Sequence, residues 1–323
     1  MQRVRELSCW GGEDIKVKPV AEVREELALG EGRTNQNFIV ESGAVRSFVR
    51  IGADLPYFGV SRPREQAAAI AAHAAGIAPR VRHAEPPDAL VVDFVSGRAL
   101  TEDDMHAAAS AGGDNAVLAN VAAAIRTLHR TPVPEALSVF LKEVSLEVPV
   151  PVGWGGPHLA MWWAYAVKRS YSRLPLLTGL EDIVAKLERA AGPLGVPRFC
   201  HFDLLADNLV MRTDGGIALV DFEYTAPGQP LMDLAVLAMG CNLNAAEERN
   251  FLAAYLEVEP SDLDLYRFKA IRVLAALRET FWGVTAELSE SSALSMDEAR
   301  SYCDMNFAKF KDLSRDFEAT PEP

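Results

Sequence analysis

The segment that decides the fold reads His201-Phe-Asp203-Leu-Leu-Ala-Asp-Asn208 and, after a short apolar stretch, continues with Asp221-Phe-Glu223. It places a carboxylate, a side-chain amide and a second carboxylate at close intervals along the chain. Each of these residues taken alone is an ordinary turn or capping residue. Their joint order and spacing indicate a single functional site.

The apolar stretch between the two polar groups predicts a β-hairpin. Residues 209–211 and 217–220 are short strand-like runs, and the turn sequence 212–216 between them contains two glycines that tolerate a positive φ. Such a hairpin returns the chain so that Asn208 lies beside Asp221. Asp203 precedes Asn208 by five residues, and from its loop it can reach the same pocket.

These residue types fit phosphoryl transfer from ATP. Mg²⁺ prefers oxygen ligands and keeps several waters, so we predict Asn208 and Asp221 as its ligands. A further carboxylate is needed to orient the attacking hydroxyl and accept its proton, and we assign that role to Asp203. Glu223 either holds a substrate cation, orients metal-bound water, or forms a salt bridge inside the loop. His201 is expected to brace the loop.

Composition narrows the class of protein. The chain has 323 residues, 49% of them hydrophobic and 24% charged, which is typical of a globular protein large enough for two domains. A net charge of −13 argues against a nucleic-acid partner and favours small cationic ligands. No apolar run approaches a membrane span, so we expect no membrane insertion and a cytoplasmic enzyme. Oligomeric state is not predicted.

The distribution of periodic segments predicts an α+β protein with two lobes. Strand-like runs at 38–40, 47–51 and 90–95, with one alanine-rich helix at about 63–75, indicate a small β-rich lobe spanning residues 1–96. From Thr101 onward the pattern becomes helical, which indicates a larger helical lobe spanning residues 97–323.

Helices of the larger lobe are predicted at residues 116–130, 158–172, 180–191, 232–241, 245–256, 262–288 and 296–316. Residues 131–158 contain most of a connector rich in proline and glycine, for which the sequence gives no structural prediction. Asp233, at the start of the helix predicted at residues 232–241, is expected to anchor the catalytic loop, residues 201–208.

The sequence resembles the choline and ethanolamine kinase family, within the aminoglycoside-phosphotransferase and protein-kinase-like superfamily. Residues 30–38 resemble the family's glycine loop and residues 48–51 its third strand. Residues 92–97 resemble the hinge, and 201–208 with 221–224 complete the kinase core. The resemblance runs from about residue 28 to 240 and implies a bilobal protein-kinase-like fold.

This resemblance implies a nucleotide site in the small lobe. Gly32, Thr34 and Asn35 of the glycine loop would contact the ATP phosphates, because backbone N–H groups of such loops approach phosphate closely. Arg50 replaces the lysine more usual in kinases, as it does in choline kinases, and would bind phosphate oxygens. Glu65 on the following helix would orient Arg50.

The resemblance also implies a substrate pocket. In choline kinases, the tyrosine after Asp-Phe-Glu and two tryptophans of a late helix help to form an aromatic cage for quaternary ammonium. Tyr224 and Trp282 match two of these positions, whereas Thr285 replaces the second tryptophan. Because a hydroxyl accepts from N–H but not from N-methyl, Thr285 leaves ethanolamine or another amino alcohol open as the acceptor.

The predicted function is therefore an ATP- and Mg²⁺-dependent kinase acting on the hydroxyl of a cationic amino alcohol of the choline or ethanolamine type. One alternative is a phosphotransferase acting on an aminoglycoside or on another small metabolite such as thiamine. A third hypothesis is an inactive pseudokinase that serves as a binding module. The last is disfavoured because Asp203, Asn208 and Asp221 are all present.

Overall fold

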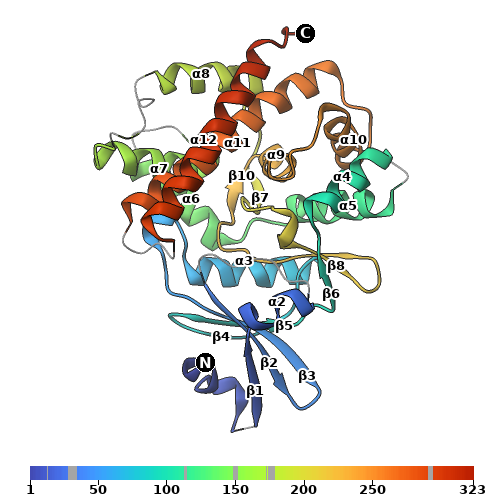
Figure 1. Ribbon diagram of the computed structural model, residues 1–323, viewed down its shortest axis with the longest axis vertical. Helices are drawn as coiled ribbons and strands as arrows, with labels where there is room; N and C mark the ends of the chain where they lie inside the picture. Colours follow the sequence, from blue (N-terminus) through green and yellow to red (C-terminus); the bar gives the residue numbers. More distant parts are fainter. Residues whose placement is uncertain are drawn as a thin grey trace.

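A computed structural model describes residues 1–12, 14–27, 35–112, 115–147, 152–171, 173, 179–289 and 294–323 of the chain, with the backbone alone at 24–27. It has the predicted α+β architecture, in which a small lobe built on a β-sheet is joined to a larger helical lobe (Figure 1). The residue boundary predicted between 96 and 97 stays a prediction.

The small lobe is built on a five-stranded antiparallel sheet with the order β1-β2-β3-β5-β4. One face buries Phe38, Val40, Val49 and Val91 against the N-terminal segment. Alternation of buried and partly exposed residues along the strands places these side chains on one side. The strands are β1 (Ile15–Pro19), β2 (Gln36–Ser42), β3 (Val45–Ile51), β4 (Val81–Glu85) and β5 (Ala89–Asp93).

Short helices flank this sheet. They are α1 (Gln2–Arg5) and α2 (Val20–Leu27), with single 3₁₀ turns at Ser8–Trp10 and Pro56–Phe58. The longer helix α3 (Arg62–Ala74) lies between the sheet and the helical lobe in Figure 1. Its alanines Ala68, Ala69 and Ala72 are buried in the main core of the molecule, so the small side chains of α3 tie the two lobes together.

A second sheet carries the predicted hairpin at the junction of the lobes. Strands β8 (Leu209–Arg212) and β9 (Ile217–Leu219) form this hairpin, and β6 (Gly97–Ala99), directly after the hinge, pairs with β8. At Gly97 an added Cβ would lie 2.2 Å from the carbonyl oxygen of Met211, so only glycine fits this crossing. The catalytic loop lies between β7 (Arg198–Cys200) and β8, and β7 pairs with β10 (Ala226–Gly228).

Helices form the remainder of the large lobe. They are α4 (Glu102–Ala111), α5 (Ala116–Arg130), α6 (Glu135–Glu147), α7 (Gly156–Lys168), α8 (Leu180–Ala191), α9 (Pro230–Gly240), α10 (Ala245–Leu256), α11 (Asp262–Leu288) and α12 (Met296–Glu318). Within the described residues, no helix is both long and apolar enough to cross a membrane.

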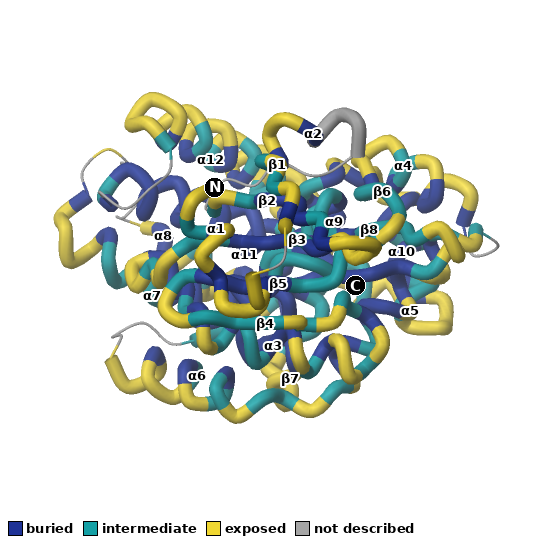
Figure 2. Tube along the Cα trace, turned by 90° about the horizontal axis from the view of Figure 1, so that it is seen from below, coloured by how far each residue is buried: buried dark blue, intermediate teal, exposed yellow. Residues whose placement is uncertain are grey.

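Burial is concentrated on the helices behind the hairpin. Helix α11 is buried along almost its whole second half and packs against α7, α8, α9 and α12. Figure 2 shows the same contrast, with buried segments inside and exposed ones on the rim. Helix α6, inside the connector for which no structure was predicted, buries Leu137, Phe140 and Val144 at helical spacing.

Candidate active site

One carboxylate of helix α9 anchors the predicted catalytic loop, residues 201–208. Asp233 on α9 accepts the backbone N–H of His201 through Oδ2 at 2.7 Å and that of Phe202 through Oδ1 at 2.8 Å. His129 Nε2 lies 3.0 Å from Oδ2. His201 Nε2 lies 2.9 Å from the carbonyl oxygen of Val220, across the hairpin. The anchoring predicted for Asp233 and the bracing predicted for His201 are both confirmed.

The hairpin brings Asn208 next to Asp203 and Asp221. The Asn208 amide donates through Nδ2 to the backbone oxygen of Asp203 at 2.8 Å and to its Oδ2 at 3.3 Å. The N–H of Val220, which precedes Asp221, donates to the backbone oxygen of Asn208 at 3.1 Å. These bonds orient the amide and fix the two strand ends beside each other, as the sequence predicted for the hairpin.

The site carries excess negative charge. Burial raises the pKa of Asp203 to about 8, and the neighbouring Glu279 and Glu223 add to this rise while Arg278 opposes it. Burial also raises the pKa of Asp221 well above its ordinary value, with Glu223 as the next cause. Asp221 has a backbone φ of +62°, a conformation that non-glycine residues adopt rarely and that occurs often at functional sites.

This chemistry fits a divalent cation. Asn208 and Asp221 present an amide and a carboxylate on adjacent strand ends, and both line one cavity. The carboxylates that raise the pKa of Asp221 repel one another, so a hard cation at this point would relieve an existing electrostatic cost.

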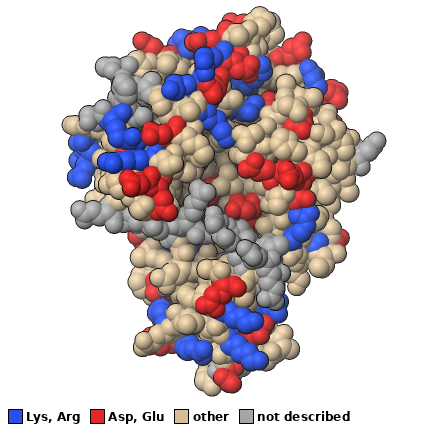
Figure 3. All heavy atoms as spheres, viewed as in Figure 1, with Lys and Arg blue, Asp and Glu red and all other residues tan. Residues whose placement is uncertain are grey.

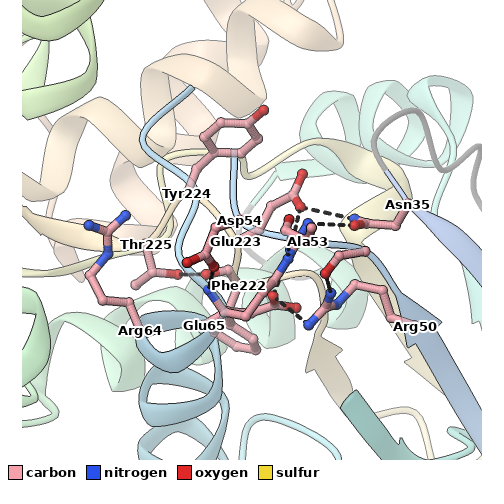
Figure 4. Close-up of polar contacts among 12 residues, drawn as sticks. Asn35, Arg50, Ala53, Asp54, Arg64, Glu65, Phe222, Glu223, Tyr224 and Thr225 are labelled. Carbon is pink, nitrogen blue, oxygen red and sulfur yellow. Dashed lines mark hydrogen bonds and ion pairs between the residues drawn. The ribbon is translucent and has the colours of Figure 1, made fainter. Parts of the chain in front are cut away.

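A buried ion-pair network joins the small lobe to this site (Figure 4). Glu65 Oε2 lies 2.9 Å from Arg50 Nη2 and 2.8 Å from Arg62 Nη1. Arg62 Nη1 also lies 3.0 Å from Glu223 Oε2, to which Asn35 Nδ2 donates at 2.9 Å. The contact predicted between Arg50 and Glu65 is therefore present, and its role in nucleotide binding stays a prediction.

Arg62 was not predicted as a site residue. It is 6% exposed, and it also donates to the Asn35 amide oxygen at 2.6 Å. The spacing of Arg62 and Glu65 on one helix is a sequence signal for this pair, but contact with Glu223, 161 positions away, depends on the fold. Glu223 is thus held in a salt bridge, one of its three predicted roles, and that salt bridge extends to the other lobe.

A cavity between the lobes lies alongside the network. Arg50, Glu65, Asn208 and Asp221 contribute to its lining, together with the hinge residues 93–95. The rest of the cavity wall is mostly apolar, which suits a flat aromatic ring system such as a nucleobase. Residues Val20, Phe48, Leu90, Val92, Val210 and Val220 contribute from both lobes. Gly32 and Thr34, predicted to contact phosphate, lie outside the described residues.

Two predicted substrate residues contact each other. Trp282 Nε1 donates to the Tyr224 hydroxyl at 2.8 Å, and the Trp282 ring meets Tyr302 edge-on with centroids 4.9 Å apart. The third predicted substrate residue, Thr285, is fully buried. Its hydroxyl donates to the Phe281 carbonyl oxygen at 2.9 Å. In this conformation, Thr285 offers a ligand no exposed atom.

The fold and the arrangement of site residues define a kinase-like phosphotransferase. The sequence model of the phosphotransferase enzyme family, APH, matches residues 26–268, and the chain belongs to this family. Solved structures titled as choline/ethanolamine kinases share the fold of this chain, as the predicted resemblance implies. A comparison with curated proteins gives no match.

Solved structures with different substrates share the fold. A choline/ethanolamine kinase family protein from Mesorhizobium loti is 23% identical, with a TM-score of 0.60 over 94% of this chain and 95% of that one. A Plasmodium vivax ethanolamine kinase is 16% identical, with a TM-score of 0.69 over 93% and 84%. A mutant aminoglycoside phosphotransferase APH(4)-Ia, complexed with AMP-PNP and hygromycin B, is 15% identical, with a TM-score of 0.61 over 95% and 96%.

Proposed function

We propose that this phosphotransferase uses ATP to phosphorylate the hydroxyl of a small cationic amino alcohol of the choline or ethanolamine type. The observation that carries the proposal is the convergence of Asp203, Asn208 and Asp221 at the end of one hairpin, beside a cavity lined from both lobes. This set offers a base and two oxygen ligands, the components that phosphoryl transfer requires.

On this proposal, the nucleotide lies in the cavity between the lobes. Its base rests against the apolar wall, and Gly32, Thr34, Asn35 and Arg50 contact its phosphates. Glu65 keeps the Arg50 guanidinium in place through the 2.9 Å contact, because a buried, paired guanidinium has little freedom to turn away. The structures of relatives with bound AMP and AMP-PNP support a nucleotide as the donor.

Asn208 and Asp221 would hold Mg²⁺, which neutralises phosphate charge when bound. Asp203 orients the acceptor hydroxyl and takes its proton as the oxygen bonds to the γ-phosphorus and the bond to the leaving ADP oxygen breaks. With a pKa of about 8, Asp203 is a stronger base than an ordinary aspartate and remains partly ionised near neutral pH.

A cationic acceptor fits the charge around Asp203. Glu279 and Glu223 raise its pKa, so a positive group bound nearby would lower that pKa and favour the ionised base. On the face shown in Figure 3, acidic side chains are visible on the part of the large lobe nearest the small lobe. Tyr224 and Trp282 would bound the acceptor pocket. A cytoplasmic location and the domain limits 1–96 and 97–323 remain parts of this proposal.

An aminoglycoside or thiamine is the alternative acceptor, favoured by the fold shared with aminoglycoside phosphotransferases. A coupled ADP assay across choline, ethanolamine, methylated ethanolamines, thiamine and kanamycin separates these cases by kcat/KM. We expect an amino alcohol to give the highest value. Negligible turnover of every amino alcohol, together with turnover of kanamycin or thiamine, would refute the amino-alcohol acceptor and support the alternative acceptor.

A further inference from the structure

Three side chains from separate segments form a closed set of hydrogen bonds at the junction of the two lobes. Arg62, the first residue of α3, donates through Nη2 to the Asn35 amide oxygen at 2.6 Å, and its Nη1 lies 3.0 Å from Glu223 Oε2. Asn35 Nδ2 donates to the same Glu223 oxygen at 2.9 Å. Figure 4 shows Asn35 and Glu223 turned towards each other. We call Asn35, Arg62 and Glu223 the inter-lobe triad.

A glycine beside the inter-lobe triad leaves room for the Asn35 amide. A Cβ atom added at Gly52 would lie 2.2 Å from Asn35 Oδ1 and 3.1 Å from Arg62 Nη2. The shorter distance is far inside van der Waals contact, so even alanine at position 52 would displace the amide. The Arg62 guanidinium has little freedom to follow, because its Nε donates to the Ala53 carbonyl oxygen at 3.0 Å and its Nη1 lies 2.8 Å from Glu65 Oε2. The fold therefore reserves this space for one amide in one orientation.

The inter-lobe triad joins the proposed phosphate site to the proposed metal site. On the small-lobe side, Glu65 contacts both Arg62 and Arg50, so the triad and Arg50 share one carboxylate. On the large-lobe side, Glu223 follows Asp221 by two residues, and its charge is the second cause, after burial, of the raised pKa of Asp221. A displacement of the triad would therefore change the positions of Arg50 and Asp221 together.

The contacts of the inter-lobe triad fix orientation more than they add stability. Arg62 and Glu223 are both buried. Removing two such charges from water costs about as much free energy as their attraction returns, so a buried ion pair is weak evidence of net stabilisation. The bonds to Asn35 supply direction instead, because a planar guanidinium and a planar amide meet in few relative orientations.

We propose that the inter-lobe triad couples the binding of ATP to the binding of Mg²⁺, with Asn35 and Arg62 as positioning residues that act through Arg50 and Asp221. The side-chain amide of Asn35 is engaged in the triad, so its proposed contact with phosphate is made by its main chain. The coupling rests on the proposed use of ATP and Mg²⁺, whereas the bonds within the triad do not. Because a coupling free energy is reciprocal, loss of the triad weakens the effect of each ligand on the binding of the other.

Binding of AMP-PNP to the full chain measures this coupling without any acceptor. Calorimetry without and with Mg²⁺ gives two Kd values, and we expect their ratio to be about tenfold or more for the wild type. Asn35→Ala removes the amide and keeps the charges of Arg62 and Glu223, whereas Gly52→Ala displaces the amide; in both variants the ratio should fall to about threefold or less. Gly195→Ala is the matched control, because a Cβ atom there meets only Gln229 Oε1 at an ordinary 3.4 Å, and it should keep the wild-type ratio.

A double variant separates positioning from a general loss of structure. In Gly52→Ala combined with Asn35→Ala, the added methyl group no longer meets the amide oxygen that would lie 2.2 Å away. The double variant should therefore have the ratio of Asn35→Ala alone, because the two substitutions remove the same interaction. Urea unfolding of the ligand-free proteins should show the same lack of additivity.

The results that contradict the coupling differ from those that contradict the proposed function. A wild-type ratio of about tenfold or more that Asn35→Ala and Gly52→Ala both retain, or losses that add in the double variant, would overturn the role of the inter-lobe triad alone. A wild type that does not bind AMP-PNP, or binds it no better with Mg²⁺, would overturn the proposed donor and metal and the coupling with them. If Gly52→Ala does not fold, the ratio for Asn35→Ala decides.

Discussion

Replacing Asp203, the proposed catalytic base, should stabilise the ligand-free protein. Asp203 titrates at about 8 in the folded chain and near 3.8 as an ordinary aspartate, so ionising it is unfavourable to the fold. At a pH between 3.8 and about 8, Asp203 has lost its proton in the unfolded chain but keeps it in the folded chain. Stability is therefore undiminished below pH 3.8 and falls as pH rises towards 8. Asp203→Asn cannot ionise, so its advantage over the wild type should grow across this range.

The expected gain in the free energy of unfolding follows from the pKa shift of Asp203. One pKa unit corresponds to about 1.4 kcal/mol, so a shift of roughly four units sets an upper limit of about 6 kcal/mol. The Asp203 side chain is only partly buried, and solvent screening reduces the effect. We expect Asp203→Asn to gain about 1–3 kcal/mol at pH 8, or about 2–12 °C in Tm at roughly 2–4 °C per kcal/mol.

Scanning calorimetry of the ligand-free protein at pH 5, 6, 7 and 8 measures this difference. Asp214→Asn is the control. The pKa of Asp214 is lowered, first by the Gly216 N–H that donates to it, so its ionised form favours the folded state. The control should therefore gain no stability as pH rises. A difference between Asp203→Asn and the wild type that is equal at pH 5 and pH 8 would refute the unfavourable ionisation of Asp203.

The remaining predictions concern the inter-lobe network and the ligand sites. Arg62→Met leaves Glu65 and Glu223 buried without this partner, so we expect a loss of about 3–5 kcal/mol in urea unfolding; a loss below 1 kcal/mol would contradict this. Arg50→Ala should raise KM for ATP about tenfold with a smaller change in acceptor KM, and equal changes would count against a phosphate contact. Asp221→Asn should raise the Mg²⁺ concentration for half-maximal activity at least about tenfold, whereas an unchanged requirement would remove Asp221 from the metal site.

Sequence patterns predicted secondary structure correctly where a single segment contains both the apolar spacing and the turn or capping residues. The hairpin around Gly215 and the helix that begins at Ala116 both form where apolar spacing and turn residues predicted them. Helix α6 was missed because prolines and glycines surround it, although Leu137, Phe140 and Val144 have helical spacing. Prolines near a segment lower its apparent helix propensity without preventing a helix inside it.

Contacts between distant segments were beyond sequence patterns. Arg62 reaches Glu223 only because α3 packs against the large lobe. Arg278 lies over the rings of Trp162 and Phe202 because α11 packs against α7 and the loop after β7. Thr285 shows the opposite case, since matching it to a family position did not reveal that its hydroxyl bonds to its own helix. Side-chain direction on a buried helix depends on every element packed around it.

Direct detection of the transferred phosphate tests the central claim. Wild type and Asp203→Ala are incubated with ATP, Mg²⁺ and ethanolamine, and products are followed by phosphorus NMR. The wild type should form one phosphoester per ADP, and Asp203→Ala should lose about a hundredfold or more of that rate. ADP accompanied only by inorganic phosphate, or equal phosphoester formation by Asp203→Ala, would contradict the assignment of Asp203 as the base that receives the acceptor's proton.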